Sequence, residues 1–431
     1  MYQLEILHIH LPEPLTAFKT KALGWANSLY QQVAYYESNQ IDFPHHGFLN
    51  FLAASNTFLP IHSDQALASL EAEMRRQKQV LCCTLSYELK NQIEPLRSAH
   101  PDFIQFPVIH FFNPEVQIHF AADKIIINSP QDNCLKIYQA ILEYQESKTL
   151  NNRNLTIEQR ISKEEYINQV NNIKQRIIEG DVYEINYCQE FYASAPGFDP
   201  VSAFLGLNEL SPMPFAGFYK VHDKYVMCAS PERFLKKSQN MLIAQPIKGT
   251  IRRGKTTPED NFLKNELATN EKEIAENMMI MDLVRNDLAR CSVTGSVVVE
   301  EMFAIYSFKQ VHQMITTIRS QVSNQTSLTE ILKSTFPMGS MTGAPKIAAM
   351  RLIEQYEAFA RGLYSGSLGY ILPNGDFDFN VVIRSMQYNA STKHLSFAVG
   401  SAITYDSDPE QEYQECLLKA AALLQVLQPK L

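Results

Sequence analysis

The stretch that decides the fold is GSLGYILPNGDFDFNVVIRSMQYNASTKHLSFA, residues 366 to 398. It holds strand-like segments at 366–372, 377–386 and 395–398, which follow one another through short turns. Further strand-like segments precede it at 215–219, 225–229 and 296–301. Strands joined by short turns pair antiparallel, whereas parallel strands need a longer crossover. We therefore predict an α+β fold with large antiparallel sheets.

Helical periodicity marks the segments 163–179, 259–290, 345–358 and 409–427. The first 150 residues are less patterned, with two strand-like runs and one helix at 106–112, 116–120 and 133–147. The polar stretch 147–153 is the best candidate for a linker. We therefore expect an N-terminal region of residues 1–150 and a catalytic domain of residues 151–431.

The composition is that of an ordinary enzyme, since 431 residues with 45% hydrophobic content can bury a large core. A net charge of -8, without a long basic run, argues against nucleic-acid and polybasic membrane binding. No stretch is apolar for long enough to span a membrane. The seven cysteines contain no Cys-x-x-Cys pair, which is typical of free thiols in a reducing compartment. We expect a cytoplasmic protein.

Two Glu-x-x-Glu units lie in helical stretches, one from Glu273 to Glu276 and one from Glu412 to Glu415. Residues three apart on a helix share a face, so each unit offers two carboxylates to one side. Such oxygens suit Mg²⁺, which keeps some waters and leaves positions for an anionic substrate. The units also fit helix starts capped by Asn270 and Asp408. Spacing alone favours capping over metal binding.

Lys248 precedes Gly249, where the chain can turn tightly, and an amine in such a place can be a covalent nucleophile. Its pKa would have to fall through burial or through cations such as Arg252 and Arg253. A solvated surface lysine is the alternative. Glu232 is likewise either an exposed turn carboxylate or, if buried, a general acid with a raised pKa.

The string from Gly249 to Thr256 satisfies the P-loop pattern Gly-x-x-x-x-Gly-Lys-Thr. A P-loop follows an uninterrupted buried strand and opens a helix. Here Pro246 interrupts the strand, and the segment 278–282, which imitates the second strand of nucleotide hydrolases, has helical periodicity. Nucleotide binding therefore remains only as the alternative from a different functional class.

From about residue 162 to about residue 424 the chain resembles the chorismate-utilising enzymes. The motifs that carry the resemblance occur in one order, as Ser230-Pro231-Glu232-Arg233-Phe234, Asp282-Leu283-Val284-Arg285-Asn286-Asp287, Gly343-Ala344-Pro345-Lys346, Arg361-Gly362-Leu363-Tyr364-Ser365-Gly366, Ile383-Arg384 and Asp406-Ser407-Asp408-Pro409-Glu410. The resemblance implies two β-sheets packed as a sandwich, with helices outside and the active site in a cleft between the sheets.

Within that family, Pro-Ile-Lys-Gly-Thr at 246–250 is typical of the branch that aminates chorismate to 4-amino-4-deoxychorismate. The alternative within the family is anthranilate synthase component I, which typically has Ala at the position of Lys248. The resemblance implies that Lys248 forms a covalent intermediate and that Glu232 protonates the leaving hydroxyl. It places His312 near the ring, whereas a packed strand histidine is the alternative.

The resemblance reverses the preference for capping and implies a Mg²⁺ site. Glu276 and Glu415 are expected as direct ligands, and Glu273 and Glu412 as residues that hold coordinated water. The substrate-binding residues are expected to be Arg384, whose guanidinium fork matches a carboxylate, together with Tyr364, Thr342, Gly343, Ala344, Gly400 and Glu184.

Two positions depart from the family pattern. Glu184 stands where aminating members usually have Gln, and Ala402 stands where a glycine is usual. We expect Glu184 to face the incoming ammonia or to pair with a nearby arginine, and we expect Gln to be tolerated there. No Gly-x-Cys-x-Gly turn of a glutamine amidotransferase is present, so a separate amidotransferase subunit is expected to supply ammonia to the chorismate site.

Overall fold

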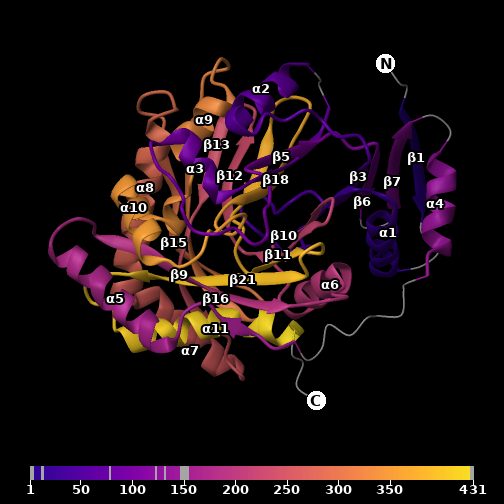
Figure 1. The fold of residues 1–431 in the computed structure, drawn as a ribbon. Coiled ribbons are helices and arrows are strands. Elements are labelled where there is room, and N and C mark those ends of the chain that lie inside the picture. Colours follow the sequence, from indigo (N-terminus) through magenta and orange to yellow (C-terminus); the bar gives the residue numbers. More distant parts are fainter. Residues whose placement is uncertain are drawn as a thin grey trace.

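The computed structural model describes residues 4–10, 14–76, 79–121, 124–130, 133–145 and 155–427. The predicted linker at 147–153 lies outside them. The described residues form two antiparallel sheets that carry helices on their outer faces (Figure 1), as the strand pattern and the family resemblance predict. No helix in the described ranges is long and apolar enough to cross a bilayer.

The larger sheet has twelve strands. Eleven of them lie in the order β1 (Leu4–His10), β7 (Lys124–Pro130), β6 (Val116–Phe120), β3 (Phe51–Ser55), β2 (Gln32–Glu37), β10 (Phe215–Val221), β11 (Lys224–Ser230), β20 (Ser385–Asn389), β21 (His394–Ile403), β9 (Glu184–Ser194) and β17 (Gly343–Ala344). The short strand β8 (Glu158–Gln159) also pairs with β9.

The smaller sheet has nine strands. Eight of them lie in the order β14 (Ile247–Arg252), β16 (Val311–Gln321), β13 (Met241–Gln245), β12 (Arg233–Ser238), β19 (Phe377–Asn380), β18 (Ser367–Ile371), β4 (Leu81–Leu85) and β5 (Ile109–Phe112). The ninth strand, β15 (Val298–Ser307), pairs with β16. Both sheets thus contain strands from either side of residue 150, and the division of the chain there stays a prediction.

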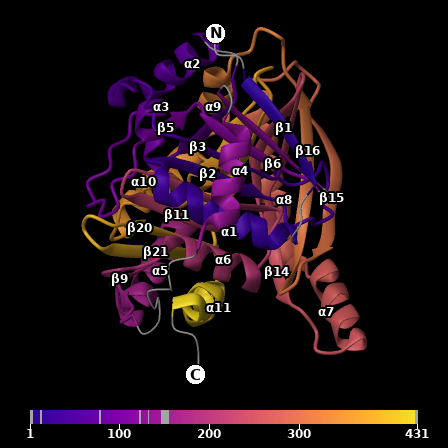
Figure 2. The same cartoon turned by 90° about the vertical axis from the view of Figure 1, so that its right-hand side faces the viewer.

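The helices of the described residues are α1 (Leu15–Leu29), α2 (Ala66–Arg76), α3 (Lys90–Ile93), α4 (Cys134–Glu143), α5 (Lys163–Ile178), α6 (Pro200–Leu210), α7 (Thr257–Thr269), α8 (Glu271–Ala289), α9 (Leu328–Thr335), α10 (Lys346–Tyr356) and α11 (Pro409–Leu427). Three short 3₁₀ turns lie at Ser63–Gln65, Tyr87–Leu89 and Gly339–Met341. α5 and α11 run beneath β9 and β21 in Figure 1, and α7 projects from the body in Figure 2.

Three apolar clusters hold these layers together. One packs α1, α4, α5, α6 and α11 against the larger sheet, and a second packs α2, α8 and α9 against the smaller sheet. The third lies between the sheets and includes Tyr36 and Tyr219 of the larger sheet and Leu368 and Tyr370 of the smaller one. Burial of this apolar area is the main stabilising contribution to the sandwich.

Two segments expected to be continuous are divided. The predicted helix 259–290 is two helices, because Asn270 ends α7 and caps α8 by accepting a hydrogen bond from the backbone of Glu273 at 3.1 Å. The predicted strand 377–386 is β19 followed by β20, since the chain crosses from the smaller sheet to the larger one at 381–384. The strand predicted at 106–112 begins only at Ile109.

All seven cysteines lie in the described ranges and are free thiols, as expected from their spacing. The string at 249–256 is not a P-loop. Its first four residues belong to β14, an antiparallel strand, and Thr256 is the N-cap of α7. The segment 278–282 lies within α8, as its periodicity predicts.

Candidate active site

The Lys248 ammonium joins the two sheets. Lys248 lies on β14 of the smaller sheet, and its Nζ donates a hydrogen bond to Oε1 of Glu184 on β9 of the larger sheet at 2.7 Å. The Lys248 side chain is 11% exposed and the Glu184 side chain is 1% exposed, so little solvent reaches the ion pair. The partner of Glu184 is therefore this lysine, and the alternative of a nearby arginine is wrong.

Gly343 explains why β9 can place Glu184 here. β17 pairs with β9 so that Gly343 lies opposite Ile185 and Ala344 opposite Glu184. A Cβ on Gly343 would lie 2.1 Å from the Glu184 carbonyl oxygen, and its φ of +147° also favours glycine. The close approach at Gly343 is thus made by the backbone of β9. Whether Gly343 and Ala344 also contact a substrate stays a prediction.

The backbone around Lys248 is clamped by α8. Asn277 donates from Nδ2 to the Lys248 carbonyl at 3.1 Å and accepts at Oδ1 from the Thr316 hydroxyl at 2.6 Å. Gly249 has φ +95°, and Glu273 Oε2 lies 3.2 Å from the position of a Cβ there. A side chain at 249 would therefore be strained by the positive φ and would crowd Glu273 and Met314, so glycine suits this position.

The charges around Lys248 differ from those expected. Burial lowers its pKa, but the carboxylates of Glu184, Glu276 and Glu415 outweigh burial, so the pKa lies above its usual range. Arg252 and Arg253 do not counter this effect, because they pair with Glu259 and Asp260 at 2.6 and 2.7 Å. The expected lowering by these two arginines is thus wrong.

Glu232 lies where the chain crosses from β11 of the larger sheet to β12 of the smaller one. Its carboxylate is 4% exposed and accepts a hydrogen bond from the Ser340 hydroxyl at 2.6 Å. Burial raises the pKa of Glu232 to about 7, although Ser340, the Lys248 charge and the Ile247 backbone lower it. Of the two alternatives for Glu232, the structure shows the buried carboxyl group.

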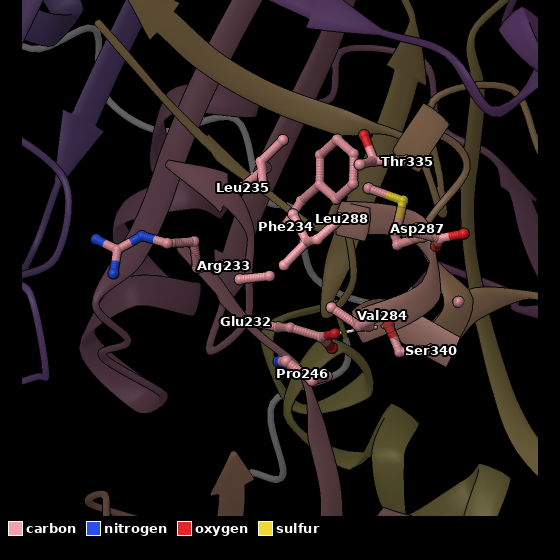
Figure 3. Close-up of a pocket in the computed structure, with 13 residues that line it drawn as sticks. Glu232, Arg233, Phe234, Leu235, Pro246, Val284, Asp287, Leu288, Thr335 and Ser340 are labelled. Carbon is pink, nitrogen blue, oxygen red and sulfur yellow. Dashed lines mark hydrogen bonds between the residues drawn. The ribbon is translucent and has the colours of Figure 1, made fainter. Parts of the chain in front are cut away.

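A cavity beside Glu232 has a mainly apolar lining. Figure 3 shows the Glu232 carboxylate pointing at Ser340, below Phe234 and Leu288, while the Arg233 guanidinium points away. Lys248 is not among the described residues that line this cavity. The cavity therefore marks the dry surroundings that raise the pKa of Glu232 rather than the whole site.

Arg384 lies at the second crossing between the sheets and has φ +50°, which is unusual for a residue with a side chain. The two crossings are joined, because the Val381 amide donates to the Glu232 carbonyl at 3.0 Å and the Ala229 amide donates to the Arg384 carbonyl at 3.1 Å. Burial holds the pKa of Arg384 below its usual range, against the opposing effect of Tyr364 and Glu415.

The Arg384 guanidinium has no carboxylate within ion-pair distance in the described part of the chain. A partly buried guanidinium without a counter-ion favours an anionic ligand. Tyr364 is buried beside it, and its hydroxyl lies 3.8 Å from the Cys188 thiol. The geometry thus suits the binding of a carboxylate by Arg384, with Tyr364 alongside.

The two Glu-x-x-Glu units begin in the first turns of α8 and α11, with Glu273 and Glu412, and continue into the second turns, which confirms the predicted helix starts. The Asp408 carboxylate accepts from the Gln411 amide at 2.9 Å at the start of α11. The units face each other, because the Lys272 ammonium lies 3.7 Å from Glu276 and 3.8 Å from Glu412. Burial raises the pKa of Glu276 to about 7, with Glu184 and Glu273 contributing.

A divalent cation fits this donor set. In the described ranges no three metal-ligating side chains are gathered closely enough to form a ready metal site. The Lys272 ammonium, however, already lies between Glu276 and Glu412 and is half exposed. The position of this ammonium shows that the space between the two units favours positive charge. Carboxylate oxygens are also ligands that Mg²⁺ takes in proteins. Glu415 is held apart by Lys419 at 2.6 Å.

Comparison with known proteins is decisive for the family. The chorismate binding enzyme family matches residues 22–425. The chain belongs to this family.

Several curated relatives are similar over much of the chain. Aminodeoxychorismate synthase, chloroplastic, of Arabidopsis thaliana is 43% identical over 264 residues, which are 61% of this chain and 28% of that protein. Aminodeoxychorismate synthase component 1 of Escherichia coli strain K12 is 36% identical, over 62% of this chain and 58% of that protein. The chain thus spans less than two thirds of both. The anthranilate synthase component I-like protein of Synechocystis is 32% identical, over 80% of this chain and 72% of that protein.

Solved structures share the fold of this chorismate-binding enzyme. Anthranilate synthase component I of Streptococcus pneumoniae has a TM-score of 0.75 at 24% identity, with 99% of this chain and 92% of that chain covered. The menaquinone-specific isochorismate synthase of Escherichia coli has a TM-score of 0.77 at 18% identity, with 99% and 95% covered. These likenesses confirm the predicted two-sheet fold.

The His312 ring is fixed between Ser307 and Asp260. Its Nδ1 lies 2.8 Å from the Ser307 hydroxyl and its Nε2 lies 3.0 Å from Asp260, which also binds Arg253. Both ring nitrogens are therefore engaged by the protein. This network favours the alternative of a packed strand histidine, and a direct role for His312 stays an untested prediction.

Thr342 and Gly400 flank β9 on opposite sides. The Thr342 carbonyl accepts from the Asn186 amide at 2.8 Å, while Gly400 lies opposite Cys188. A Cβ on Gly400 would lie 2.4 Å from the Cys188 sulfur, so packing alone requires this glycine. Ala402, where a glycine is usual, lies opposite Asn186 at the start of β9. Substrate contacts of Thr342 and Gly400 stay predictions.

Sequence reasoning missed the residues that support this enzyme's site. Asn277 and Ser340 clamp Lys248 and Glu232, and Arg361 bonds to Glu357 as well as to the Asn186 and Met341 carbonyls. Arg361 and Asn277 lie in or beside segments that resemble family motifs, but no spacing rule predicts their partners. Ser340 lies 108 residues from Glu232 in the sequence, and no local signal points to it.

Proposed function

We propose that this protein aminates chorismate with ammonia to give 4-amino-4-deoxychorismate, the precursor of p-aminobenzoate and folate. The observation that carries the proposal is the mostly buried Lys248 amine, which donates to the Glu184 carboxylate at 2.7 Å. The charges of Glu276, Glu415 and Glu232 also act on it. A nucleophilic amine next to a carboxyl group that is half protonated near neutral pH suits the displacement of a hydroxyl group.

In the first half of the reaction Lys248 acts as the nucleophile and Glu232 acts as the general acid. The neutral Lys248 amine attacks ring C2, the C1=C2 and C5=C6 double bonds shift to C1=C6 and C4=C5, and the C4–O bond breaks. Glu232 donates the proton that lets the C4 hydroxyl leave as water. Because Glu232 has a pKa of about 7, it still holds its proton over part of the neutral range.

Ammonia completes the second half. It attacks C4, the double bonds return to C1=C2 and C5=C6, and Lys248 leaves C2. The ionised Glu232 takes the proton that the new C4 ammonium releases, which restores the acid. The amino group thus ends at C4, where the hydroxyl was, and pyruvate stays on the ring.

Substrate positioning falls to Arg384, Tyr364 and the carboxylates of α8 and α11. Arg384 pairs with one carboxylate of chorismate, which supplies the counter-ion that the guanidinium lacks within the protein. Glu276 and Glu415 would hold Mg²⁺ directly, and Glu273 and Glu412 would bind water molecules beside it. When bound, Mg²⁺ neutralises these glutamates and provides a Lewis acid for the other substrate carboxylate.

The choice of amination over other chorismate chemistry rests on Lys248 and on the named relatives. Relatives named aminodeoxychorismate synthase match at 36% to 43% identity. Anthranilate synthesis is the second candidate, favoured by the Synechocystis relative, which the chain covers to 72%. That reaction eliminates pyruvate, so the product distinguishes the two.

A separate glutamine amidotransferase subunit supplies the ammonia. With Mg²⁺, chorismate and ammonium salt at alkaline pH, the isolated protein should form 4-amino-4-deoxychorismate, identified by mass, and should leave glutamine intact. Release of pyruvate with an aromatic product would establish anthranilate synthesis instead. Hydrolysis of glutamine by the protein alone would refute the two-subunit arrangement.

A further inference from the structure

Glu184 has an unusual environment for a buried carboxylate. Its side chain is 1% exposed, Lys248 bonds to Oε1, and Oε2 has no hydrogen-bond partner among the described residues. Carboxylates that stay ionised in a protein interior commonly accept several N–H or O–H donors. Glu184 has one strong donor, and that donor is the group that must lose a proton before it can react.

We infer that Glu184 is the internal proton acceptor for Lys248, so that the ion pair becomes a neutral amine and a carboxylic acid before the amine attacks. The inference rests on the proposed function, because it specifies how its nucleophile is generated. Glu184 touches the reacting amine at 2.7 Å, which is within reach of direct proton transfer.

The proton balance of the step is closed within the pair. One proton moves from Nζ of Lys248 to the Glu184 carboxylate, and the total charge of the site does not change. Either carboxylate oxygen of Glu184 can carry this proton, because Oε2 has no other partner among the described residues. In a dry environment a neutral pair avoids the desolvation cost of two separate charges. When ammonia displaces Lys248, the proton returns from Glu184 to the free amine.

Other charged groups also face Lys248. Glu276 comes from α8, Glu415 from α11, and Glu232 from the crossing between β11 and β12. All three carboxyl groups favour the ammonium form when they are ionised, but none of them lies within ion-pair distance of Nζ in the described part of the chain. Of these carboxylates, only Glu184 can therefore accept the proton directly.

The pH dependence of Glu184→Gln distinguishes a proton acceptor from a simple counter-ion. If Glu184 accepts the proton, the reactive pair has the same number of protons as the resting pair, so its population does not change with pH. In Glu184→Gln the lysine must lose its proton to solvent, so the population of neutral amine rises about tenfold per pH unit below its pKa.

The experiment measures chorismate consumption at low substrate concentration, with Mg²⁺ and a saturating amine nucleophile, between pH 6 and 9 by about half-unit steps. The expected result is a Glu184→Gln variant that is slower than the wild type, contrary to the tolerance that the family pattern predicts, and whose rate, divided by the wild-type rate, rises with pH. Glu184→Asp should keep a ratio that does not change with pH. If Glu184 were only a counter-ion, Glu184→Gln would be equally fast or faster at a constant ratio, which would overturn the inference.

Glu190→Gln is the matched control. Glu190 is another buried glutamate of β9, paired with Arg160 at 2.7 Å. Removing its charge costs stability but should leave the pH profile unchanged.

A second measurement does not depend on chorismate chemistry. Acetic anhydride acylates neutral amines, so peptide mass spectrometry of the labelled protein reports how readily Lys248 loses its proton. Between pH 6 and 9 the labelling rate of Lys248 should stay nearly constant in the wild type and rise with pH in Glu184→Gln, by up to about tenfold per pH unit, while that of Lys272 rises with pH in both proteins. A wild-type labelling rate of Lys248 that rises with pH as steeply as that of Glu184→Gln would overturn the inference. A wild-type protein that never consumes chorismate would refute the proposed function, whatever the labelling shows.

Discussion

Replacing Ser340 by Ala should shift the pH dependence of the first chemical step towards higher pH. The Ser340 hydroxyl donates to the Glu232 carboxylate at 2.6 Å and stabilises its ionised form. Burial raises the pKa of Glu232 to about 7, and Ser340 is the largest of the effects that lower it. Without the hydroxyl the carboxylate keeps its burial and loses this donor, so the pKa must rise.

The size of the shift follows from the hydrogen bond. A bond to a charged group contributes about 1.5–3 kcal/mol and one to a neutral acid about 1 kcal/mol, so their difference is about 1.4 kcal/mol, or about one pKa unit. Glu232 must be protonated to act as an acid. The wild-type rate should therefore fall as the pH rises through about 7, and that of Ser340→Ala through about 8.

The assay is rapid-quench mass spectrometry of the enzyme mixed with chorismate and Mg²⁺ in the absence of ammonia. The quantity compared is the pH at which the rate is half its acidic plateau, which does not depend on the plateau itself. Ser396→Ala is the matched control, because Ser396 donates to the buried Glu190 at the same 2.6 Å. A midpoint that stays in place or moves to lower pH in Ser340→Ala would refute the general-acid role of Glu232.

Three further predictions concern the metal, the substrate carboxylate and the backbone. Glu276→Ala or Glu415→Ala should abolish Mg²⁺-dependent turnover, measured by product formation; normal rates with a loss of only about 1 kcal/mol in stability would show that these residues merely favour helix starts. Arg384→Gln should weaken chorismate binding about 10- to 100-fold by calorimetry, because a charge-assisted pair of about 1.5–3 kcal/mol is lost; an unchanged dissociation constant would exclude that contact. Gly343→Ala should lower the free energy of unfolding in urea by about 2 kcal/mol or more, since its Cβ meets the Glu184 carbonyl, whereas Gly375→Ala, with φ +82° and open space around it, should cost about 1 kcal/mol. Equal losses in the two glycine variants would contradict the close approach.

The strands and helices that depend on local pattern could be predicted from the sequence. The segments 215–219 and 225–229 are β10 and β11, and 409–427 is α11, because alternation, turn residues and an N-cap lie within a few residues of one another. The split of 377–386 could not be predicted. Residues 381–384 are as apolar as the strands beside them, and periodicity does not show that the chain changes sheets there.

The site was predictable in its residue types but not in its pairings. The two Glu-x-x-Glu units follow from helical spacing, whereas the Lys272 ammonium that lies near both of them was not predicted. The Lys248–Glu184 pair joins residues 64 apart in the sequence, on different sheets. Local proximity was misleading for Arg252 and Arg253, because a neighbouring helix supplies their partners, Glu259 and Asp260. Charge pairing across a fold depends on strand order, which composition does not contain.

The covalent step at Lys248 is the central claim, and peptide mass spectrometry of the quenched protein tests it most directly. The protein is incubated with chorismate and Mg²⁺ without ammonia, quenched and digested, and Lys248→Ala is treated in parallel. We predict an adduct with the mass of chorismate less one water, carried by the peptide that contains Lys248, lost when ammonia is added and absent from the variant. An adduct on another residue, or chorismate amination at the wild-type rate by Lys248→Ala, would contradict the account.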